Sequence, residues 1–220
     1  MKNKMAKALI LVLAIAFSFT LFTACSTTGG STTGDANNGG TQNYSKGLAY
    51  AANEDGKTCA ITGIGTCKDT EVVIPETVEG YTVTSIGEFA FSSCIELESV
   101  VIPDSVISIG DYALSACIAL ESVVIPDSVT SIGEFAFSGC YSLTSVVIGN
   151  SVTSIGYAAF SYCDSLTSIV IPDSVKYMGQ NVFSNCIYLT VVKCEHESQP
   201  SDWDENWNKS NKTVVWDYKA

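Results

Sequence analysis

Residues 123–145 read VVIPDSVTSIGEFAFSGCYSLTS, and the same pattern returns every 23 residues along much of the chain. The interval is kept by a glycine row (Gly87, Gly110, Gly133, Gly156, Gly179), a leucine row (Leu97, Leu120, Leu143, Leu166, Leu189) and a cysteine row (Cys94, Cys117, Cys140, Cys163, Cys186). A fixed period between about 20 and 50 residues is typical of a repeat architecture. Because stacked repeats present rows of equivalent side chains, we expect functional residues to form such rows rather than one catalytic pocket.

Each 23-residue unit predicts one coil of a solenoid. Val123 and Ile125 alternate with outward residues, which indicates a short strand, and Pro126 ends it because proline cannot continue a hydrogen-bonded ladder. Residues 129–132 can form a second short strand, and residues 134–140 suit one helical or 3₁₀ turn. The predicted fold is a leucine-rich-repeat type of solenoid, built mainly from short parallel β-strands, over residues 72–194.

Both flanks of the array depart from the repeat and predict β-rich caps, because a single coil cannot bury its two flat faces alone. Residues 44–80 contain the array start and the turn signal Asn53–Gly56, which predicts a hairpin cap. Residues 195–220 contain all three tryptophans, which we expect to cover the last coil. A sugar-binding aromatic platform is the alternative role for these tryptophans.

The first 24 residues have the features of a secretory signal peptide: three lysines, a short apolar stretch and a small residue before Cys25. A cysteine at this position resembles the lipobox of bacterial lipoproteins, although Phe22 stands where leucine is usual. We therefore expect lipidation of Cys25. The alternative, an uncleaved membrane anchor, is less favoured because a span needs about 20 apolar residues. Residues 25–43 continue as a lipidated cysteine and a flexible Ser/Thr/Gly linker.

The charge balance excludes nucleic-acid binding. The chain has 11 lysines, no arginine and 23 acidic residues, and loss of residues 1–24 would lower its formal charge from −12 to −15. Nucleic-acid binders need cations for phosphate contacts. We expect a lipid-anchored protein on the outer face of the cell membrane, attached through lipid on Cys25.

The cysteine row predicts buried free thiols that act as small apolar side chains. The row lacks histidines and paired CxxC spacing, so we expect no metal site and no cofactor. Cys59 and Cys67 flank a predicted turn and are the better candidates for a disulfide.

The sequence gives little support for an enzyme. The acidic row Glu88, Asp111, Glu134 could attract a cation such as calcium, but a solvated edge is the favoured interpretation, since the dense carboxylate loop of a calcium site is lacking. The single histidine, His196, lies in the C-terminal cap. We expect no catalytic residues.

Outward-facing strand positions give the leading candidate binding face. Its residues form a serine row and a valine row: Ser99, Val101, Ser122, Val124, Ser145, Val147, Ser168 and Val170. A contiguous apolar stripe on a strand face is a candidate contact surface. Phe89, Tyr112 and Phe135 form a second candidate row. The alternative is that both rows serve only packing and β-propensity.

Residues 72–194 resemble the BspA-type leucine-rich repeat family. The units VVIPDSVISIGDYALSACIALES and VVIPDSVTSIGEFAFSGCYSLTS follow the family's pattern of Ile-Pro, then Val-x-x-Ile-Gly-x-x-Ala-Phe-x-x-Cys, then Leu. Departures are Gly149-Asn150 in place of Pro-Asp and Ala158 in place of an aromatic residue. The resemblance implies a parallel solenoid on a bacterial cell surface, in a family where some members adhere to host matrix proteins or to other microbes.

These observations favour a surface adhesion module that contacts a protein or glycan through the repeat face. The first alternative is a structural spacer without a specific ligand. A hydrolase-associated accessory domain is a remote one.

Overall fold

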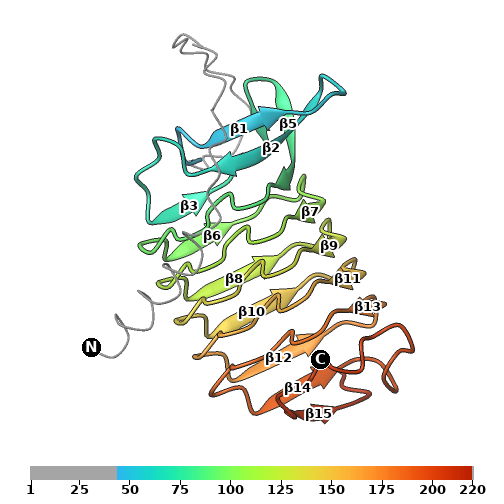
Figure 1. Ribbon diagram of the computed structural model, residues 1–220. Helices are drawn as coiled ribbons and strands as arrows, with labels where there is room; N and C mark the ends of the chain where they lie inside the picture. The colour runs from blue at the N-terminus through green and yellow to red at the C-terminus, as the bar shows by residue number, and fades with distance from the viewer. Residues whose placement is uncertain (1–43, 220) are drawn as a thin grey trace, which may run out of the picture. The chain divides into compact units, whose positions relative to one another are not determined.

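The computed structural model describes residues 44–219, which form a β-solenoid (Figure 1). The predicted signal peptide, Cys25 and the linker lie outside the described residues. Two rows of strands run along the stack. The first row contains β3 (Glu71–Val73), β6 (Ser99–Val101), β8 (Ser122–Ile125), β10 (Ser145–Ile148), β12 (Ser168–Ile171), β14 (Val191–Cys194) and β15 (Thr213–Val215). The second contains β5 (Tyr81–Ile86), β7 (Ser108–Ile109), β9 (Ser131–Ile132), β11 (Ser154–Ile155) and β13 (Tyr177–Met178).

The strands of successive coils pair in parallel, in the register that the 23-residue period predicts. In the first row, Val123 of β8 lies opposite Val100 and Val146. In the second row, Ile132 of β9 lies opposite Ile109 and Ile155. The second row belongs to one eight-stranded sheet, whereas the first divides into the sheets β10-β8-β6-β3 and β12-β14-β15. The predicted solenoid of parallel strands is therefore confirmed.

The N-terminal end of the stack is an antiparallel hairpin. Strands β1 (Ala49–Ala52) and β2 (Thr58–Gly63) pair across the turn, and β2 then pairs in parallel with β5. The short strand β4 (Thr77–Val78) also pairs with β5. Asp55 Oδ1 accepts hydrogen bonds from the backbone N–H groups of Lys57 and Thr58, at 2.8 and 2.9 Å. These bonds favour the ionised carboxylate and lower the pKa of Asp55.

The third segment of each coil is a series of tight turns, and residues 44–219 contain no helix. The expectation of a helical or 3₁₀ turn is not met. The N–H groups of Tyr112 and Leu114 donate to the carbonyls of Glu134 and Ala136 in the next coil, both at 2.8 Å, whereas Ser115 donates locally to Tyr112. In a 3₁₀ helix, every backbone N–H group donates to the carbonyl of the residue three positions earlier. Alternate N–H groups bind the neighbouring coil instead, so no continuous helix forms.

Two residues of each turn segment adopt positive φ angles. The first row has φ between 51° and 59° and comprises Phe89, Tyr112, Phe135, Ala158 and Asn181. The second comprises Ser93, Ala116, Gly139, Tyr162 and Asn185. This left-handed conformation costs a residue with a side chain about 1–2 kcal/mol. Residues of both rows donate their own N–H groups to the next coil, as Tyr112 does to the carbonyl of Glu134 and Ala116 to that of Ser138.

The core lies between the strand rows and the turn segments. Its centre is a column of fully buried phenylalanines: Phe137 and Phe160 stack with ring centroids 5.2 Å apart and nearly parallel planes, and Phe160 stacks on Phe183 at 6.0 Å. Burying each such side chain contributes about 1.5–3 kcal/mol.

The tryptophans of the C-terminal segment cover the end of this column. Trp207 meets Phe183 edge to face at 6.3 Å, and Trp203 donates from Nε1 to the carbonyl of Val175 at 3.1 Å. Trp203 and Trp207 are only 4% and 3% exposed. Neither ring is therefore available as a sugar-stacking platform.

The glycine row marks the closest approach between coils. A Cβ atom on Gly133 would lie 2.6 Å from the backbone nitrogen of Asp111, and one on Gly156 would lie 2.6 Å from that of Glu134. Real Cβ atoms essentially never come this close to other heavy atoms. Any side chain here would force adjacent coils apart.

We expect Gly133→Ala to lower the free energy of unfolding by about 1–3 kcal/mol, the usual cost of overpacking a tight contact. Denaturant-induced unfolding of the variant measures this loss. Ser145→Ala, at an exposed position of β10, is the matched control and should change stability by less than about 0.5 kcal/mol. Equal effects of the two substitutions would contradict the close approach.

Candidate surface on the strand face

The outward valines form a stripe across β6, β8 and β10. Val101, Val124 and Val147 are 50%, 61% and 53% exposed, whereas Val170 on β12 is half-buried. Parallel strands lie about 4.8 Å apart, so the three exposed side chains follow one another along the stack. Their neighbours in each strand are buried in the core. The strand alternation therefore places these valines where the sequence predicted them.

The serine row lies at the start of the same strands. Ser122 and Ser145 are exposed, whereas Ser99 and Ser168 are half-buried. At the other end of the strands, a cleft of about 430 Å³ is lined by Val124 and Val147 together with the turns that follow. Asp127 in one of these turns accepts a hydrogen bond from the Asn150 N–H at 2.6 Å. An apolar stripe thus runs between a hydroxyl-bearing edge and a turn edge with carboxylates.

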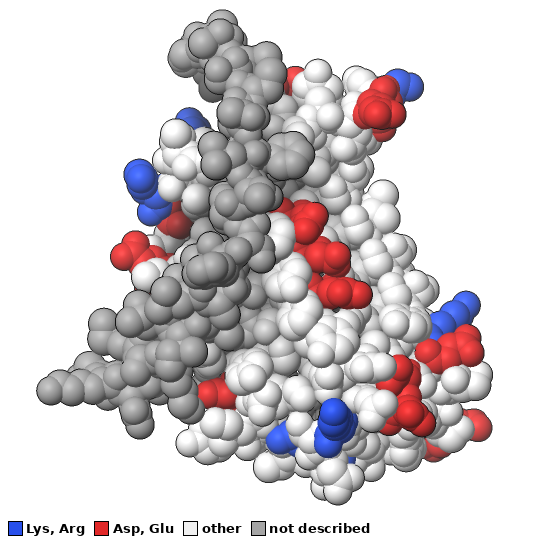
Figure 2. All heavy atoms as spheres, viewed as in Figure 1, with Lys and Arg blue, Asp and Glu red and all other residues white. Residues whose placement is uncertain are grey.

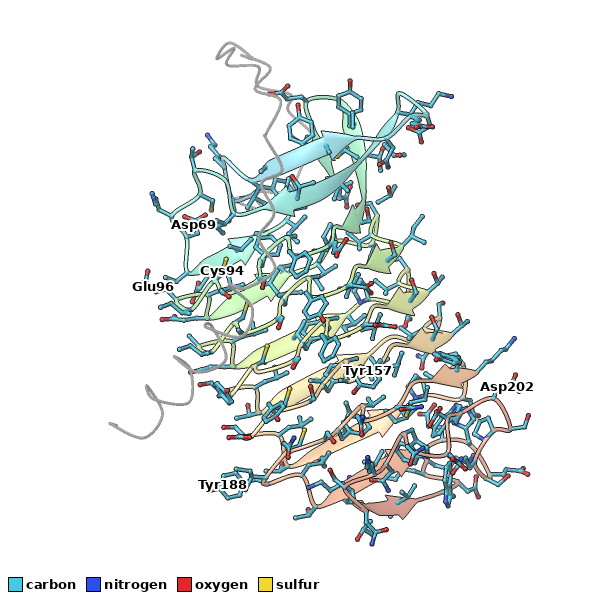
Figure 3. The ribbon with its side chains drawn as sticks, viewed as in Figure 1. Asp69, Cys94, Glu96, Tyr157, Tyr188 and Asp202 are labelled. Atoms are coloured by element: carbon cyan, nitrogen blue, oxygen red, sulfur yellow. The ribbon has the colours of Figure 1, made fainter. Side chains whose placement is uncertain are left out.

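The second candidate row forms a stack of aromatic rings on the turn segments, called here the aromatic ladder. Phe89, Tyr112 and Phe135 have ring centroids 4.8 Å apart at each step and planes within 13° of parallel. Tyr157, labelled in Figure 3, adds a fourth ring, which meets Phe135 edge to face at 5.1 Å. Tyr157 was not predicted as part of this row, although an aromatic residue one position before Ala158 was a visible signal.

The acidic row Glu88, Asp111 and Glu134 is exposed beside the aromatic ladder. Asp111 Oδ1 accepts a hydrogen bond from the Glu134 N–H at 2.7 Å. Burial, and then the charges of the three carboxylates, raise the pKa of the Tyr112 hydroxyl. Figure 2 shows a column of acidic side chains on the face in view, with lysines only toward the two ends of the stack. Residues 44–219 contain no group of His, Cys, Asp and Glu side chains able to hold a metal ion.

The cysteine row has a structural use. The thiols of Cys117, Cys140, Cys163 and Cys186 each donate to the carbonyl of the residue 26 positions earlier, with sulfur-to-oxygen distances of 3.1, 3.2, 3.3 and 3.0 Å. All four are fully buried. Burial raises the pKa of Cys140 to about 12 and that of Cys117 well above its usual value. All four thiols are therefore hydrogen-bond donors of the core, and Cys117 and Cys140 are poor nucleophiles. Cys186 differs, because its hydrogen bond with Cys163 lowers its pKa.

Cys94 and Cys67 differ from the rest because both line one surface cleft of about 240 Å³. Cys94 is half-buried and lies near Asp69 and Glu96, as labelled in Figure 3. All eight cysteines among the described residues are free thiols, so the disulfide suggested for Cys59 and Cys67 is not formed.

His196 contributes to the cap. Its Nε2 lies 3.0 Å from the carbonyl oxygen of Val175, and its ring meets Trp203 edge to face at 5.1 Å. Its Nδ1 lies 3.9 Å from a carboxylate oxygen of Asp173. These contacts fix the ring against the last coil of the array.

Residues 65–193 match the BspA type leucine rich repeat region, in six copies. The chain belongs to the BspA-type leucine-rich repeat family. Among solved structures, a leucine-rich repeat protein of T. pallidum is 33% identical, with 70% of this chain and 71% of that chain covered and a TM-score of 0.66. None of the curated proteins compared matches this chain.

Two further structures are similar to this BspA-type array. A leucine rich cell surface protein of Faecalibacterium prausnitzii is 26% identical over 84% of this chain and 56% of that one, with a TM-score of 0.63. A leucine-rich repeat protein of Bacteroides ovatus is 29% identical over 70% of this chain and 47% of that one, with a TM-score of 0.59. The chain spans about half the length of these two proteins. In residues 44–219 of the BspA-type chain, no helix is long and apolar enough to cross a membrane.

The geometry predicts that the thiols of the BspA-type array differ in reactivity. Burial raises the pKa of Cys94 as well, but this side chain is only half-buried and lines a surface cleft. At pH 8 we therefore expect iodoacetamide to alkylate Cys94 in the folded protein, although more slowly than in the denatured protein. Cys140 should stay unmodified, because the thiolate is the reactive form and burial keeps this thiol protonated. Mass spectrometry after timed labelling measures both rates. Denatured protein is the control, in which every cysteine should react. Equal rates for Cys94 and Cys140 in the folded protein would show that the array does not protect its thiols.

Proposed function

We propose that the chain is a non-catalytic binding module that contacts a protein or glycan on the cell exterior through the valine stripe of β6, β8 and β10. The observation that carries this proposal is the exposure of Val101, Val124 and Val147, which are half or more accessible in a fold that buries its other valine and isoleucine rows. Large aliphatic side chains at aligned positions form a continuous apolar strip, and such strips mark interaction surfaces.

Polar groups on both sides of the stripe support the same function. The exposed Ser122 and Ser145 can donate and accept hydrogen bonds, and the turns at the other edge contribute carboxylates. An apolar centre with a polar rim is the common arrangement of a protein interface. The similarity to a leucine rich cell surface protein supports a surface location.

We also propose that the protein is held at the outer face of the cell membrane by lipid on Cys25, with the linker as spacer. The support is the sequence of residues 1–25: a basic start, a short apolar stretch and a cysteine after a small residue.

Replacement of Val101, Val124 and Val147 together with lysine should abolish the binding contact, because three buried ammonium groups would have to be desolvated at the interface. Binding of the full chain to immobilised host matrix proteins and to a glycan array measures the effect. The matched control is Ile107→Lys/Thr130→Lys/Thr153→Lys, which adds the same charge at the same spacing on exposed positions directly before β7, β9 and β11. Unchanged binding by the valine variant would overturn the proposal. A wild-type chain that binds none of these targets would favour the spacer.

Substitution of Cys25 by serine should abolish incorporation of radiolabelled fatty acid in the expressing cell and release the protein from the membrane fraction. A serine hydroxyl cannot replace the thiol that receives the lipid. Ser26→Ala is the control, one residue further on, and should keep both the label and the membrane fraction. Retained label in the Cys25 variant would exclude this anchor.

A further inference from the structure

The fold does not require aromatic residues in the ladder. Ala158 and Asn181 occupy the equivalent positions of later coils, with φ angles of 51° and 59° that match the 54° of Tyr112. A bulky side chain in this left-handed region is strained, whereas asparagine is favoured there. The first three coils nevertheless carry Phe89, Tyr112 and Phe135. Stacking between these rings offsets part of the strain. Phe89 is also 46% accessible, whereas Tyr112 and Phe135 are half-buried.

Phe89 is the first ring of the ladder and its most accessible one of the three, with 46% of the residue exposed. It stacks on Tyr112, and the ring contacts of the described residues give it no second ring. At the other end of the ladder, Tyr157 meets Phe135 edge to face. A planar group of a partner could therefore continue the stack on Phe89.

Negative charge accompanies each of the first three rings of the ladder. Glu88, Asp111 and Glu134 directly precede the three rings and are exposed. Neither of the two ion pairs of the described residues involves them. No lysine or arginine occurs between Lys68 and Lys176, so the central coils carry no cation of their own. Figure 2 shows this division of charge on the face in view.

We infer that the aromatic ladder and its carboxylates bind an arginine-bearing segment of a partner protein, at a surface distinct from the valine stripe. A guanidinium group is planar, can stack on the accessible ring of Phe89 and can bind a carboxylate through two parallel hydrogen bonds. The three carboxylates lie one per coil, so they span about 10 Å along the stack. About three residues of an extended peptide have the same length. The ligand is thus a short segment with two or three arginines, and the complementarity is both electrostatic and aromatic.

The inference is tested with fluorescein-labelled octa-arginine. Fluorescence anisotropy in 50 mM salt measures its binding to the full chain. The variant Glu88→Gln/Asp111→Asn/Glu134→Gln should raise the Kd about tenfold or more, because charge-assisted hydrogen bonds are lost. The matched control is Asp104→Asn/Asp127→Asn/Asp173→Asn, which removes equal charge at exposed turn positions of the same period. It should raise the Kd less than about threefold, because distant exposed charges are screened. Equal weakening by the two variants would overturn the inference, since it would show attraction to overall charge alone.

The aromatic half of the site has its own test. The variant Phe89→Ala/Tyr112→Ala/Phe135→Ala places alanine at all three ring positions, as the chain itself does at Ala158. This variant should bind octa-arginine several-fold more weakly, whereas its affinity for octa-lysine should change little. The reason is that a guanidinium group stacks on aromatic rings better than an ammonium group does. Thermal unfolding shows whether this variant folds. If it does not, Tyr112→Asn, which follows Asn181, supplies the same readout. Octa-arginine affinity that is unchanged in a folded aromatic variant would overturn the role of the ladder.

Discussion

The backbone contact between adjacent coils is the constraint on which the rest of the structure depends. Strands pair 23 residues apart, alternate N–H groups of the turn segment donate to the next coil, and the glycine row lets the chains approach where a Cβ atom would come within 2.6–2.9 Å of backbone. Buried backbone groups must find hydrogen-bond partners. In this protein the partners are in the next coil, so no coil is stable on its own. Side-chain rows, including the thiols that bind carbonyls 26 residues earlier, follow from that register.

The period and the alternation of Val123, Val124 and Ile125 were enough to predict the solenoid, its parallel strands and the outward direction of the valines. These features follow from local periodicity, which a single sequence contains. The turn segment could not be predicted in the same way. Its composition suits a helical turn, but the destination of each N–H group depends on the carbonyls of a neighbouring coil, and sequence periodicity does not reveal that competition. The contact of Tyr157 with the aromatic ladder could not be predicted for a similar reason. Tyr157 stands one position before the ladder position of its coil, and its ring still reaches the ladder.

The two candidate surfaces differ in what the fold requires of them. Outward strand positions must hold some residue with high β-propensity, so valine there has a structural reason as well as a functional one. The ladder positions have a left-handed backbone that disfavours aromatic side chains, so rings there need an additional reason. The acidic central coils also limit which partners can approach, because like-charged molecules are repelled over a distance of about 10 Å at moderate salt.

Because both ends of the array are covered, the number of coils between them can change during evolution. The hairpin of β1 and β2 closes one end, and Trp203 and Trp207 close the other, so the array does not present open coil faces that would join chains end to end. The coils between them are nearly interchangeable. A duplication or deletion of 69 bases in the gene would add or remove one whole coil and leave both ends intact. Unequal recombination can therefore adjust the length of the binding surfaces in steps of one coil without creating a new fold.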